Sequence, residues 1–436
     1  MNRGRKRGRI QGPRVTQGST FSLTRMLHPV KRAHFVQHYW EKQPLRIRRN
    51  DPDYYSDLLT LADVDRILSA TGIRPPQIRI VRDGQAISSG KASTAPFLRS
   101  NALELEELYS AYRDGATVVL QFLHERWLAL ARLCESLAHE FSASFQVNAY
   151  LTPAHEKGLA PHYDTHDVFV MQVSGVKHWR VYAAPVFLPL KSQPYESKTM
   201  QPGKLLMEFD LDEGDLLYLP RGFAHDAVSG DSASLHLTVG VNSVTWASVL
   251  MAAIESATTA DGCLRCSLPI GFANSKRARE NISRQLNALL GALAKRIDVS
   301  AVIEDAAIAA QCSRRPFLDD HLLDLERLAE VNRRTRVRVR LTIKPEVTTT
   351  SKILSLIFHG KRVQLPAHTK CDVEFILRGH EFTPDDLPGC LDQSGRITLI
   401  RTLIREGLVT ICRTRGRLFP TNDDRIGNRS RLPELR

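Results

Sequence analysis

The chain of 436 residues is longer than one ordinary domain, and we expect two or three domains. With 42% hydrophobic and 25% charged residues it has a globular composition, and no apolar run approaches the roughly 20 residues that a membrane helix needs. The net charge of +13 favours acidic partners, and the basic N-terminus lacks the apolar stretch of a signal peptide.

Seven cysteines are scattered through the chain, which favours reduced thiols in a cytoplasm over a disulfide framework. Cys263 and Cys266 have the spacing of one zinc-ligand pair, but no second pair stands nearby, so zinc is only a minor alternative there. We therefore expect a cytoplasmic protein.

The positive charge gathers in two runs. One lies in residues 1–30, a Gly-punctuated tail that we expect to be disordered, and the other spans residues 333–340, where arginine alternates with valine as in an edge strand. Two interpretations stay open for both runs: solvated surface, or affinity for an acidic partner such as RNA or a ribonucleoprotein. Neither run is interleaved with aromatic residues, so a base-stacking signature is missing. The residues are Arg3, Arg5, Lys6, Arg7, Arg9, Arg14, Arg333, Arg334, Arg336, Arg338 and Arg340.

After the tail, the pattern predicts mixed helices and strands. Lys31–Trp40 has helical apolar spacing and leads into a turn and a short strand at Glu41–Ile47. The apolar stripe within Thr60–Ala70 predicts a second helix. We also expect strands at Gln77–Arg82 and Thr117–Phe122 and helices at Leu103–Tyr112 and Trp127–Phe141.

From Phe145 the chain changes to short strand-like runs separated by glycine and proline turns. Many short strands with such turns predict an antiparallel barrel or sandwich. A barrel with an open mouth also suits a site built from inward-facing side chains. The expected strands are Gln146–Thr152, Asp167–Val173, His178–Tyr182, Lys204–Asp210, Asp215–Leu219 and Ser234–Asn242.

The remainder returns to helical patterns from Trp246 to Ala329. Lys352–Phe358 is compatible with a strand or a short helix. Helices are expected at Asp372–Leu377 and Arg396–Glu406, before a strand at Leu408–Ile411. Helices followed by a strand in a compact basic segment resemble a winged helix, a motif that binds nucleic acid in some proteins and serves only for packing in others.

His162 and Asp164 are the strongest candidate metal ligands. A strand places residues i and i+2 on one face, so the imidazole and the carboxylate can converge. An H-x-D pair alone is a weak signal, since chance supplies it often. Here Asp215–Leu219 predicts a strand that ends in the turn Pro220–Gly222 and delivers His225. A second histidine from a later strand would complete the triad of the non-haem Fe(II) oxygenases.

Four stretches of the chain carry a family resemblance: Tyr39–Leu45, Asn148–Pro153, Gly158–Tyr182 and Asp215–Asp226. They resemble the JmjC/cupin-like ribosomal oxygenases, Fe(II)- and 2-oxoglutarate-dependent hydroxylases of ribosomal proteins. The resemblance implies an α+β fold, with a JmjC-type double-stranded β-helix (a cupin-like barrel), a helical dimerisation segment and a C-terminal winged-helix-like domain. The implied parts are a basic disordered tail (1–30), the catalytic domain (31–248), the dimerisation segment (249–340) and the winged-helix-like domain (341–436).

Carried over residue by residue, the resemblance makes His162, Asp164 and His225 the iron ligands. It also makes Lys177 the residue that pairs with the distal carboxylate of 2-oxoglutarate, a role that suits an ammonium group. The alternative for Lys177 is a solvated lysine in a turn. Three further positions, Asn148, Tyr150 and Thr238, match residues that line the cosubstrate or substrate pocket, although Asn and Thr on strands often only satisfy backbone groups.

The other histidines have less specific roles. For His166, two residues beyond Asp164, we expect a contact with substrate or support of a ligand rather than a place among the ligands. His236 either lines the pocket or is a satisfied interior histidine. His155 and His178 are expected on a loop and an exposed strand face.

The candidate triad together with the family resemblance predicts an Fe(II)- and 2-oxoglutarate-dependent oxygenase that acts on a protein or peptide. The resemblance further implies hydroxylation of a histidine or arginine. A ribosomal protein and a biosynthetic precursor peptide both stay open as substrates, and we expect a homodimer with RNA or ribosome contacts through its basic segments. The alternative is a cupin-like ligand-sensing regulatory protein that binds nucleic acid through the winged helix. A sensor would not need the full triad together with a carboxylate-pairing lysine.

Overall fold

The computed structural model describes residues 21–70, 73, 75–82, 85–87, 105–312, 318–340, 343 and 345–412. The expectations for the first 20 residues lie outside this range. Contacts divide the chain into two compact units, which meet in sequence between Phe317 and Leu318. Each unit is described by itself.

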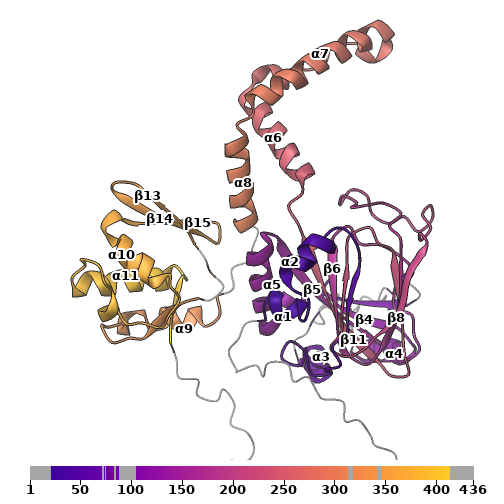
Figure 1. Ribbon diagram of the computed structural model, residues 1–436, viewed down its shortest axis with the longest axis horizontal. Helices are drawn as coiled ribbons and strands as arrows, with labels where there is room; N and C mark the ends of the chain where they lie inside the picture. The colour runs from indigo at the N-terminus through magenta and orange to yellow at the C-terminus, as the bar shows by residue number, and fades with distance from the viewer. Residues whose placement is uncertain are drawn as a thin grey trace, which may run out of the picture. The chain divides into compact units, whose positions relative to one another are not determined.

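The first unit is built on two sheets whose strands pair antiparallel (Figure 1). The larger sheet has the strand order β1-β9-β6-β11-β5-β4-β2-β3, and the smaller has the order β10-β7-β8. The predicted antiparallel barrel or sandwich is therefore confirmed. The strands are β1 (Leu45–Ile47), β2 (Ile78–Arg82), β3 (Gln85–Ile87), β4 (Thr117–Leu120), β5 (Ser144–Thr152), β6 (Asp167–Ser174), β7 (Lys177–Tyr182), β8 (Leu205–Leu211), β9 (Leu216–Leu219), β10 (His225–Ser229) and β11 (Ser234–Asn242).

Strand β6 is buried on both of its faces. Phe169 and Met171 pack with the helices in one apolar cluster, while Val168 and Val170 join a second cluster that includes Trp179 of the smaller sheet. Successive side chains of a strand point to opposite faces, so a strand covered on both sides reads as a continuous apolar run. The second cluster is the layer between the two sheets, and it supports the floor of the site described below.

Helices cover the other face of the larger sheet. In Figure 1, α1, α2 and α5 gather beside β5 and β6, and residues of these helices share one apolar cluster with those strands. The four helices predicted for this part of the chain are confirmed: α2 (Arg32–His38), α3 (Leu61–Ala70), α4 (Leu105–Arg113) and α5 (Leu128–Phe141).

Residues 21–30 belong to the core and not to a disordered tail. Helix α1 (Leu23–Leu27) begins after Ser22, whose hydroxyl caps the helix, and it buries its two leucines and its methionine. The backbone N–H of Leu23 donates to Glu140 Oε1 in α5 at 3.0 Å. The prediction of a tail that reaches residue 30 is therefore wrong at its end, because contacts distant in sequence order a short apolar helix next to the basic run.

Three helices follow the barrel: α6 (Trp246–Ala260), α7 (Lys276–Arg296) and α8 (Val299–Cys312). Thr245 and Ser248 form a capping box that begins α6. Helix α6 contacts both α7 and α8, yet no residue of α7 is buried. The predicted helical character of this segment is confirmed. None of the described helices is long and apolar enough to cross a membrane.

The second unit combines two small sheets with three described α-helices around its own apolar core. Lys352–Phe358, for which a strand and a helix were both open, contains strand β14, and its neighbours β13 and β15 were not predicted. The winged-helix interpretation and the boundary at residue 341 stay predictions. The elements are α9 (His321–Glu326), β12 (Val337–Val339), β13 (Glu346–Thr349), β14 (Ile353–Phe358), β15 (Lys361–Pro366), α10 (Lys370–Ile376), α11 (Gln393–Arg405) and β16 (Val409–Ile411).

The arginine run before residue 341 is not a uniformly solvated strand face. Arg340 is buried, with Nη2 at 2.9 Å from Asp324 Oδ2 and Nη1 at 3.1 Å from Asp319 Oδ1. Arg336 Nη2 lies 3.1 Å from Glu381 Oε2. The solvated interpretation is wrong for Arg340, because a buried guanidinium needs partners inside its own unit.

Candidate metal centre

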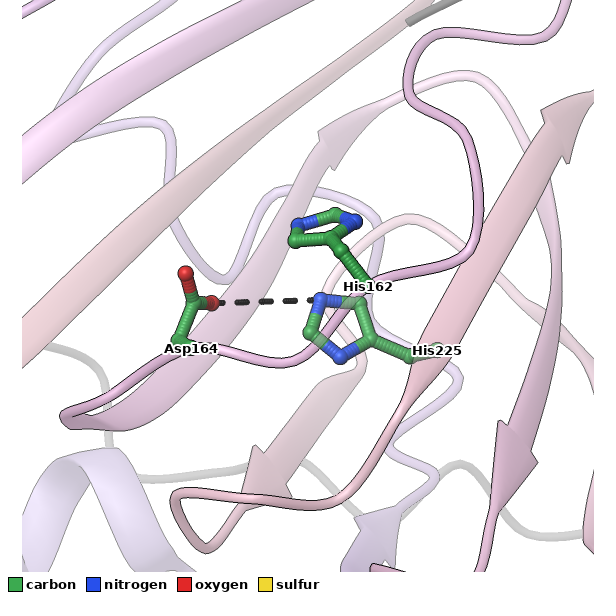
Figure 2. Close-up of side chains that lie close together, drawn as sticks. All are labelled: His162, Asp164 and His225. Carbon is green, nitrogen blue, oxygen red and sulfur yellow. Dashed lines mark ion pairs between the residues drawn. The ribbon is translucent and has the colours of Figure 1, made fainter. Parts of the chain in front are cut away.

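Two antiparallel segments, residues 155–167 and 221–230, bring the predicted triad together (Figure 2). At their centre the N–H of His225 donates to the carbonyl of His162 at 2.8 Å, and the N–H of His162 donates back at 3.2 Å. The N–H of Gly222 donates to the carbonyl of Asp164 at 3.0 Å. Gly222 has φ +92°, and a Cβ there would lie 2.1 Å from a backbone oxygen, so this turn requires glycine.

Among the described residues, His162, Asp164 and His225 form the one group of histidine, cysteine and acidic side chains whose ligand atoms all lie within 4.8 Å of one another. His225 Nε2 lies 3.9 Å from Asp164 Oδ2, and the two imidazole centroids are 4.6 Å apart. Figure 2 shows the carboxylate and the two rings turned toward one another. Two nitrogens and one oxygen therefore converge as in the 2-His-1-carboxylate set typical of non-haem Fe(II).

Backbone carbonyls orient both imidazoles. The Nδ1 atom of His162 lies 2.8 Å from the carbonyl oxygen of Ala160, and that of His225 lies 3.1 Å from the carbonyl oxygen of Phe223. A neutral ring that donates through Nδ1–H has its Nε2 lone pair available for a metal. Burial is the main cause that lowers the pKa of His225 to about 4, and the nearby His162 is the second. The ring is therefore neutral near pH 7. The donor set thus fits a divalent metal in both composition and tautomer.

A cavity of about 510 Å³, counted with its open mouth, adjoins the triad and contains Lys177 in its lining. Lys177 is only 3% exposed, and its Nζ donates to Thr152 Oγ1 at 2.9 Å. Burial lowers the pKa of Lys177 to about 7. The alternative of a solvated turn lysine is therefore wrong. A buried ammonium with a hydroxyl partner at the wall of a cavity is suited to a carboxylate ligand.

Comparison with known proteins agrees with this geometry. A family model for the JmjC domain matches residues 121–249. Ribosomal oxygenase 1 of Danio rerio is 32% identical over 318 residues, which cover 68% of this chain and 56% of the relative. Ribosomal oxygenase 2 of Mus musculus is 30% identical over 287 residues, which cover 63% and 59%. This chain contains a JmjC domain and is similar in sequence to ribosomal oxygenases.

Two further comparisons match a different extent of the chain. The Drosophila persimilis protein named bifunctional lysine-specific demethylase and histidyl-hydroxylase NO66 is 32% identical over 220 residues, covering 50% of this chain and 31% of that protein. The X-ray structure of E. coli YcfD is 14% identical with a TM-score of 0.51, covering 88% of this chain and 98% of that one, and it shows the same fold. This chain spans a little over half the length of the first two relatives.

Tyr150 and Thr238 of this JmjC domain line the same cavity as Lys177, as expected. The ring of Tyr150 stacks on His236, with centroids 4.9 Å apart and planes 2° apart. Burial raises the pKa of Tyr150 to about 12, so its hydroxyl stays protonated. Asn148 does not line the cavity. Its Oδ1 accepts a hydrogen bond from the N–H of Phe122 at 3.0 Å, so it satisfies a backbone group, as Asn on strands often does.

The structure also places the other histidines of the domain. His236 is buried in the cavity wall, and its Nδ1 has no hydrogen-bond partner among the described residues, so it is not a satisfied interior histidine. His166 lies against Gly240, where a Cβ would approach its ring to 2.6 Å. His155 and His178 have side chains 72% and 45% exposed, which confirms their expected surface positions.

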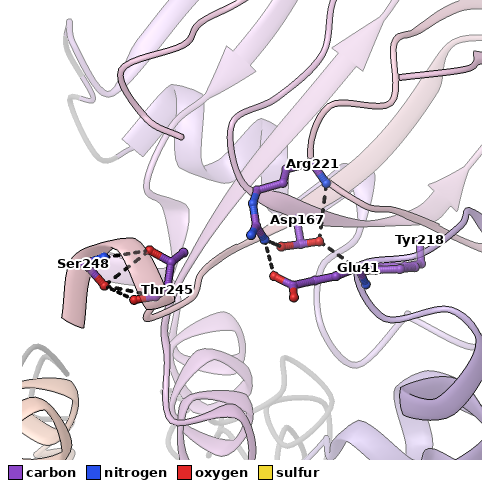
Figure 3. A network of polar contacts seen from close by, with 6 residues as sticks. All are labelled: Glu41, Asp167, Tyr218, Arg221, Thr245 and Ser248. Atoms are coloured by element: carbon purple, nitrogen blue, oxygen red, sulfur yellow. Dashed lines mark hydrogen bonds and ion pairs between the residues drawn. The ribbon is translucent and has the colours of Figure 1, made fainter. Parts of the chain in front are cut away.

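Sequence reasoning missed two buried carboxylates beside the triad. Asp226 follows His225 and pairs with Lys157 and Arg180, while Asp167 opens β6 and pairs with Arg221 (Figure 3). Both acids stand next to apolar strand residues in the sequence. An acidic residue next to buried strand residues needs a cationic or hydrogen-bonding partner. This feature of the sequence could have predicted the two buried ion pairs.

Proposed function

We propose that the protein is an Fe(II)- and 2-oxoglutarate-dependent oxygenase that hydroxylates a histidine or arginine of a protein or peptide. One observation carries the proposal: His162, Asp164, His225 and the buried Lys177 all line one cavity. The triad supplies the ligands for iron, and Lys177 supplies a cation for the distal carboxylate of the cosubstrate. Bound iron and 2-oxoglutarate would supply the oxidation of an unactivated C–H bond.

The protein's own residues would position the reactants. The Nε2 atoms of both histidines and the Asp164 carboxylate would hold the metal, since the Nδ1 atom of each histidine lies against a backbone carbonyl. Thr152 Oγ1 fixes the Lys177 ammonium, and the stacked Tyr150 and His236 rings form a rigid wall beside it. Side chains locked in this way reduce the ordering that the ligands must impose on binding.

The proposed substrate is a polypeptide. The relatives are named ribosomal oxygenases and, in one case, a histidyl-hydroxylase, which supports hydroxylation of a ribosomal protein. A biosynthetic precursor peptide would use the same machinery and stays open as the second candidate substrate. We further propose a cytoplasmic location, on the basis of the dispersed cysteines.

The test of this function is a search for one added oxygen atom. Ribosomal proteins and total protein from cells with and without this chain are compared by mass spectrometry, with the Asp164→Ala variant as a matched negative control. We expect a histidine- or arginine-containing peptide that gains one oxygen only with the wild-type chain. Oxidation of free amino acids, with none of any peptide, would contradict the polypeptide substrate.

The regulatory alternative is not favoured, and the second unit adds an argument against it. Helix α11 would be the helix to enter a nucleic-acid groove. Its Arg396 and Arg401 instead donate to backbone carbonyls of the same unit, such as that of Asp385 at 3.0 Å and that of Val331 at 2.8 Å. These two guanidinium groups are used inside the unit, which reduces the charge that the helix offers for phosphate contacts, although Arg405 at its end is exposed.

We propose that the chain forms a homodimer through α6, α7 and α8, which occupy the first part of the segment 249–340 assigned to dimerisation except that α6 begins at Trp246. Leu286, Leu289 and Leu290 of α7 are all exposed, which favours burial against a second copy. The Leu286→Glu variant should be monomeric by sedimentation at micromolar concentration, whereas Ala288→Glu, which adds the same charge off this stripe, should remain dimeric. A monomeric wild type would contradict the proposal. Leu293 continues the same helical spacing of leucines along α7, which is the apolar stripe that the sequence predicts for this segment.

We also propose that basic segments bring the enzyme to an acidic partner such as RNA or a ribosomal particle. The support is the net charge of +13 together with the basic run that ends at Arg14. The partner's chemistry, and not its identity, follows from charge alone. A winged-helix-like domain over residues 341–436 remains part of the proposal as a packing module.

A further inference from the structure

Two ion pairs join the two segments that carry the triad, one on each side of the ligands. Between residues 155–167 and 221–230 the antiparallel register aligns Lys157 with Val228 and His162 with His225. The ligands lie in the middle of this pairing. One charged pair lies beyond His162, toward the start of the first segment, and another lies beyond Asp164, toward its end.

The first pair joins Lys157 to Asp226. Lys157 Nζ lies 2.9 Å from Asp226 Oδ2, and the carboxylate is fully buried. Lys157 lies five residues before His162, and Asp226 is the residue after His225, so this contact links the approaches to the two histidine ligands. Asp226 has a second cation, because Arg180 Nε of β7 donates to its Oδ1 at 3.0 Å.

The second pair joins Arg221 to Asp167 (Figure 3). Arg221 Nη1 lies 2.9 Å from Asp167 Oδ2, with side chains 10% and 1% exposed. Arg221 lies four residues before His225, and Asp167 lies three residues after Asp164. Arg221 also pairs with Glu41, which is outside both segments. The hydroxyl of Tyr218 and the backbone N–H of Arg221 also donate to Asp167 Oδ1, at 3.0 Å and 3.4 Å.

We infer that the ion pairs Lys157–Asp226 and Arg221–Asp167 act together as a clamp that sets the spacing of the triad and thereby its metal affinity. This inference rests on the proposed metal centre. Ligands from two separate segments bind a metal well only if the segments are held in register before the metal arrives. Backbone hydrogen bonds also join the segments, at His162 and His225, at Asp164 and Gly222, and at residues 155–156 with 229–230. The two ion pairs add side-chain links on either side of the ligands. The four charged residues are positioning residues and not ligands.

The chain offers matched controls for this inference. Arg180 pairs with the same carboxylate as Lys157, but it belongs to β7, so its removal breaks an Asp226 ion pair without unlinking the segments. Glu41 plays the same part for Arg221. The test variants are therefore Lys157→Met and Asp167→Asn, and the controls are Arg180→Met and Glu41→Gln. Lys157→Met leaves Asp226 paired with Arg180, so it is the variant in which the fold is best preserved.

The experiment measures Co(II) binding to the full chain without cosubstrate, by calorimetry and by the visible absorption of the bound ion. Unfolding of the metal-free variants by denaturant is measured in parallel. We expect Lys157→Met and Asp167→Asn to weaken Co(II) binding by about 10- to 100-fold, the effect typical of residues that support metal ligands, and to alter the absorption spectrum. The two controls should change the affinity by less than about threefold, well under that range.

The outcomes separate the inference from the proposed function. Co(II) binding by the wild type with equal affinity in Lys157→Met would overturn the clamp and leave the metal centre standing. Equal weakening in test and control variants would show a general loss of stability and would also overturn it. Absence of Co(II) binding by the wild type would instead refute the metal centre, and the clamp with it. If Asp167→Asn fails to fold, Lys157→Met and Arg180→Met decide the question alone.

Discussion

The His225→Ala variant should lose both stoichiometric metal and turnover while it retains its fold. His225 supplies one of three ligand atoms, so the loss of affinity should exceed the roughly 100-fold effect of removing a residue that merely supports a ligand. The side chain lies at the start of β10 and borders the cavity, so its removal enlarges an existing space and does not create a sealed void in the apolar core. Iron content, succinate production and far-UV circular dichroism measure the three expectations.

His166→Ala is the matched control for that variant. It removes a histidine two residues from Asp164 that contributes no atom to the triad group. This variant should retain one metal ion per chain, whatever its effect on the substrate. Stoichiometric iron together with undiminished succinate production in His225→Ala would refute the ligand assignment.

The Lys177→Ala variant should raise the apparent constant for 2-oxoglutarate about tenfold to a hundredfold. A charge-assisted hydrogen bond to a buried carboxylate contributes roughly 1.5–3 kcal/mol, which corresponds to that range. Lys177 is 3% exposed and Thr152 Oγ1 is its hydrogen-bond partner, so water cannot readily replace the lost ammonium. Metal affinity should change little, which distinguishes this variant from His225→Ala. An unchanged cosubstrate titration would move the carboxylate-binding role to another residue.

The same lysine predicts how cosubstrate affinity depends on pH. Burial lowers the pKa of Lys177 to about 7, so without cosubstrate the amine is mostly charged below pH 7 and mostly neutral above it. A carboxylate ligand favours the charged form and raises this pKa in the complex, so binding takes up a proton above pH 7. Affinity should therefore be flat below about pH 7 and fall by up to tenfold per pH unit above it. Lys177→Arg, whose guanidinium stays charged, should bind more weakly or equally but without this slope. An equal slope in both proteins would contradict the assignment.

The triad was predictable from sequence because its chemistry is local. His162 and Asp164 are two residues apart, and the spacing alone places them on one face of an extended chain. His225 follows a short apolar strand and a glycine turn, both of which have clear sequence signatures. Lys177 was proposed through family resemblance, since nothing in a lysine after a turn distinguishes a buried cation from a solvated one.

Tertiary contacts determined which polar and charged side chains are buried. Arg340 belongs to an alternating arginine run that reads as a solvated strand, yet the structure buries it against Asp319 and Asp324. Asn148 and Tyr150 lie two residues apart on β5, but only Tyr150 lines the cavity. The environment of a polar side chain depends on which distant segment packs over it, and no local pattern records that.

The amino-acid sequence by itself indicated an antiparallel barrel or sandwich, the helices α2, α3, α4 and α5 and the three candidate ligands, because periodicity and turn residues act over a few positions. Only the tertiary structure decided that residues 21–30 join the core, that Lys177 is buried, and that ion pairs tie the two ligand segments together. In each of these cases the partner lies far along the chain: Glu140 for Leu23, Thr152 for Lys177, Asp226 for Lys157. Burial and charge pairing are properties of such distant contacts, and they are defined only once the chain has folded.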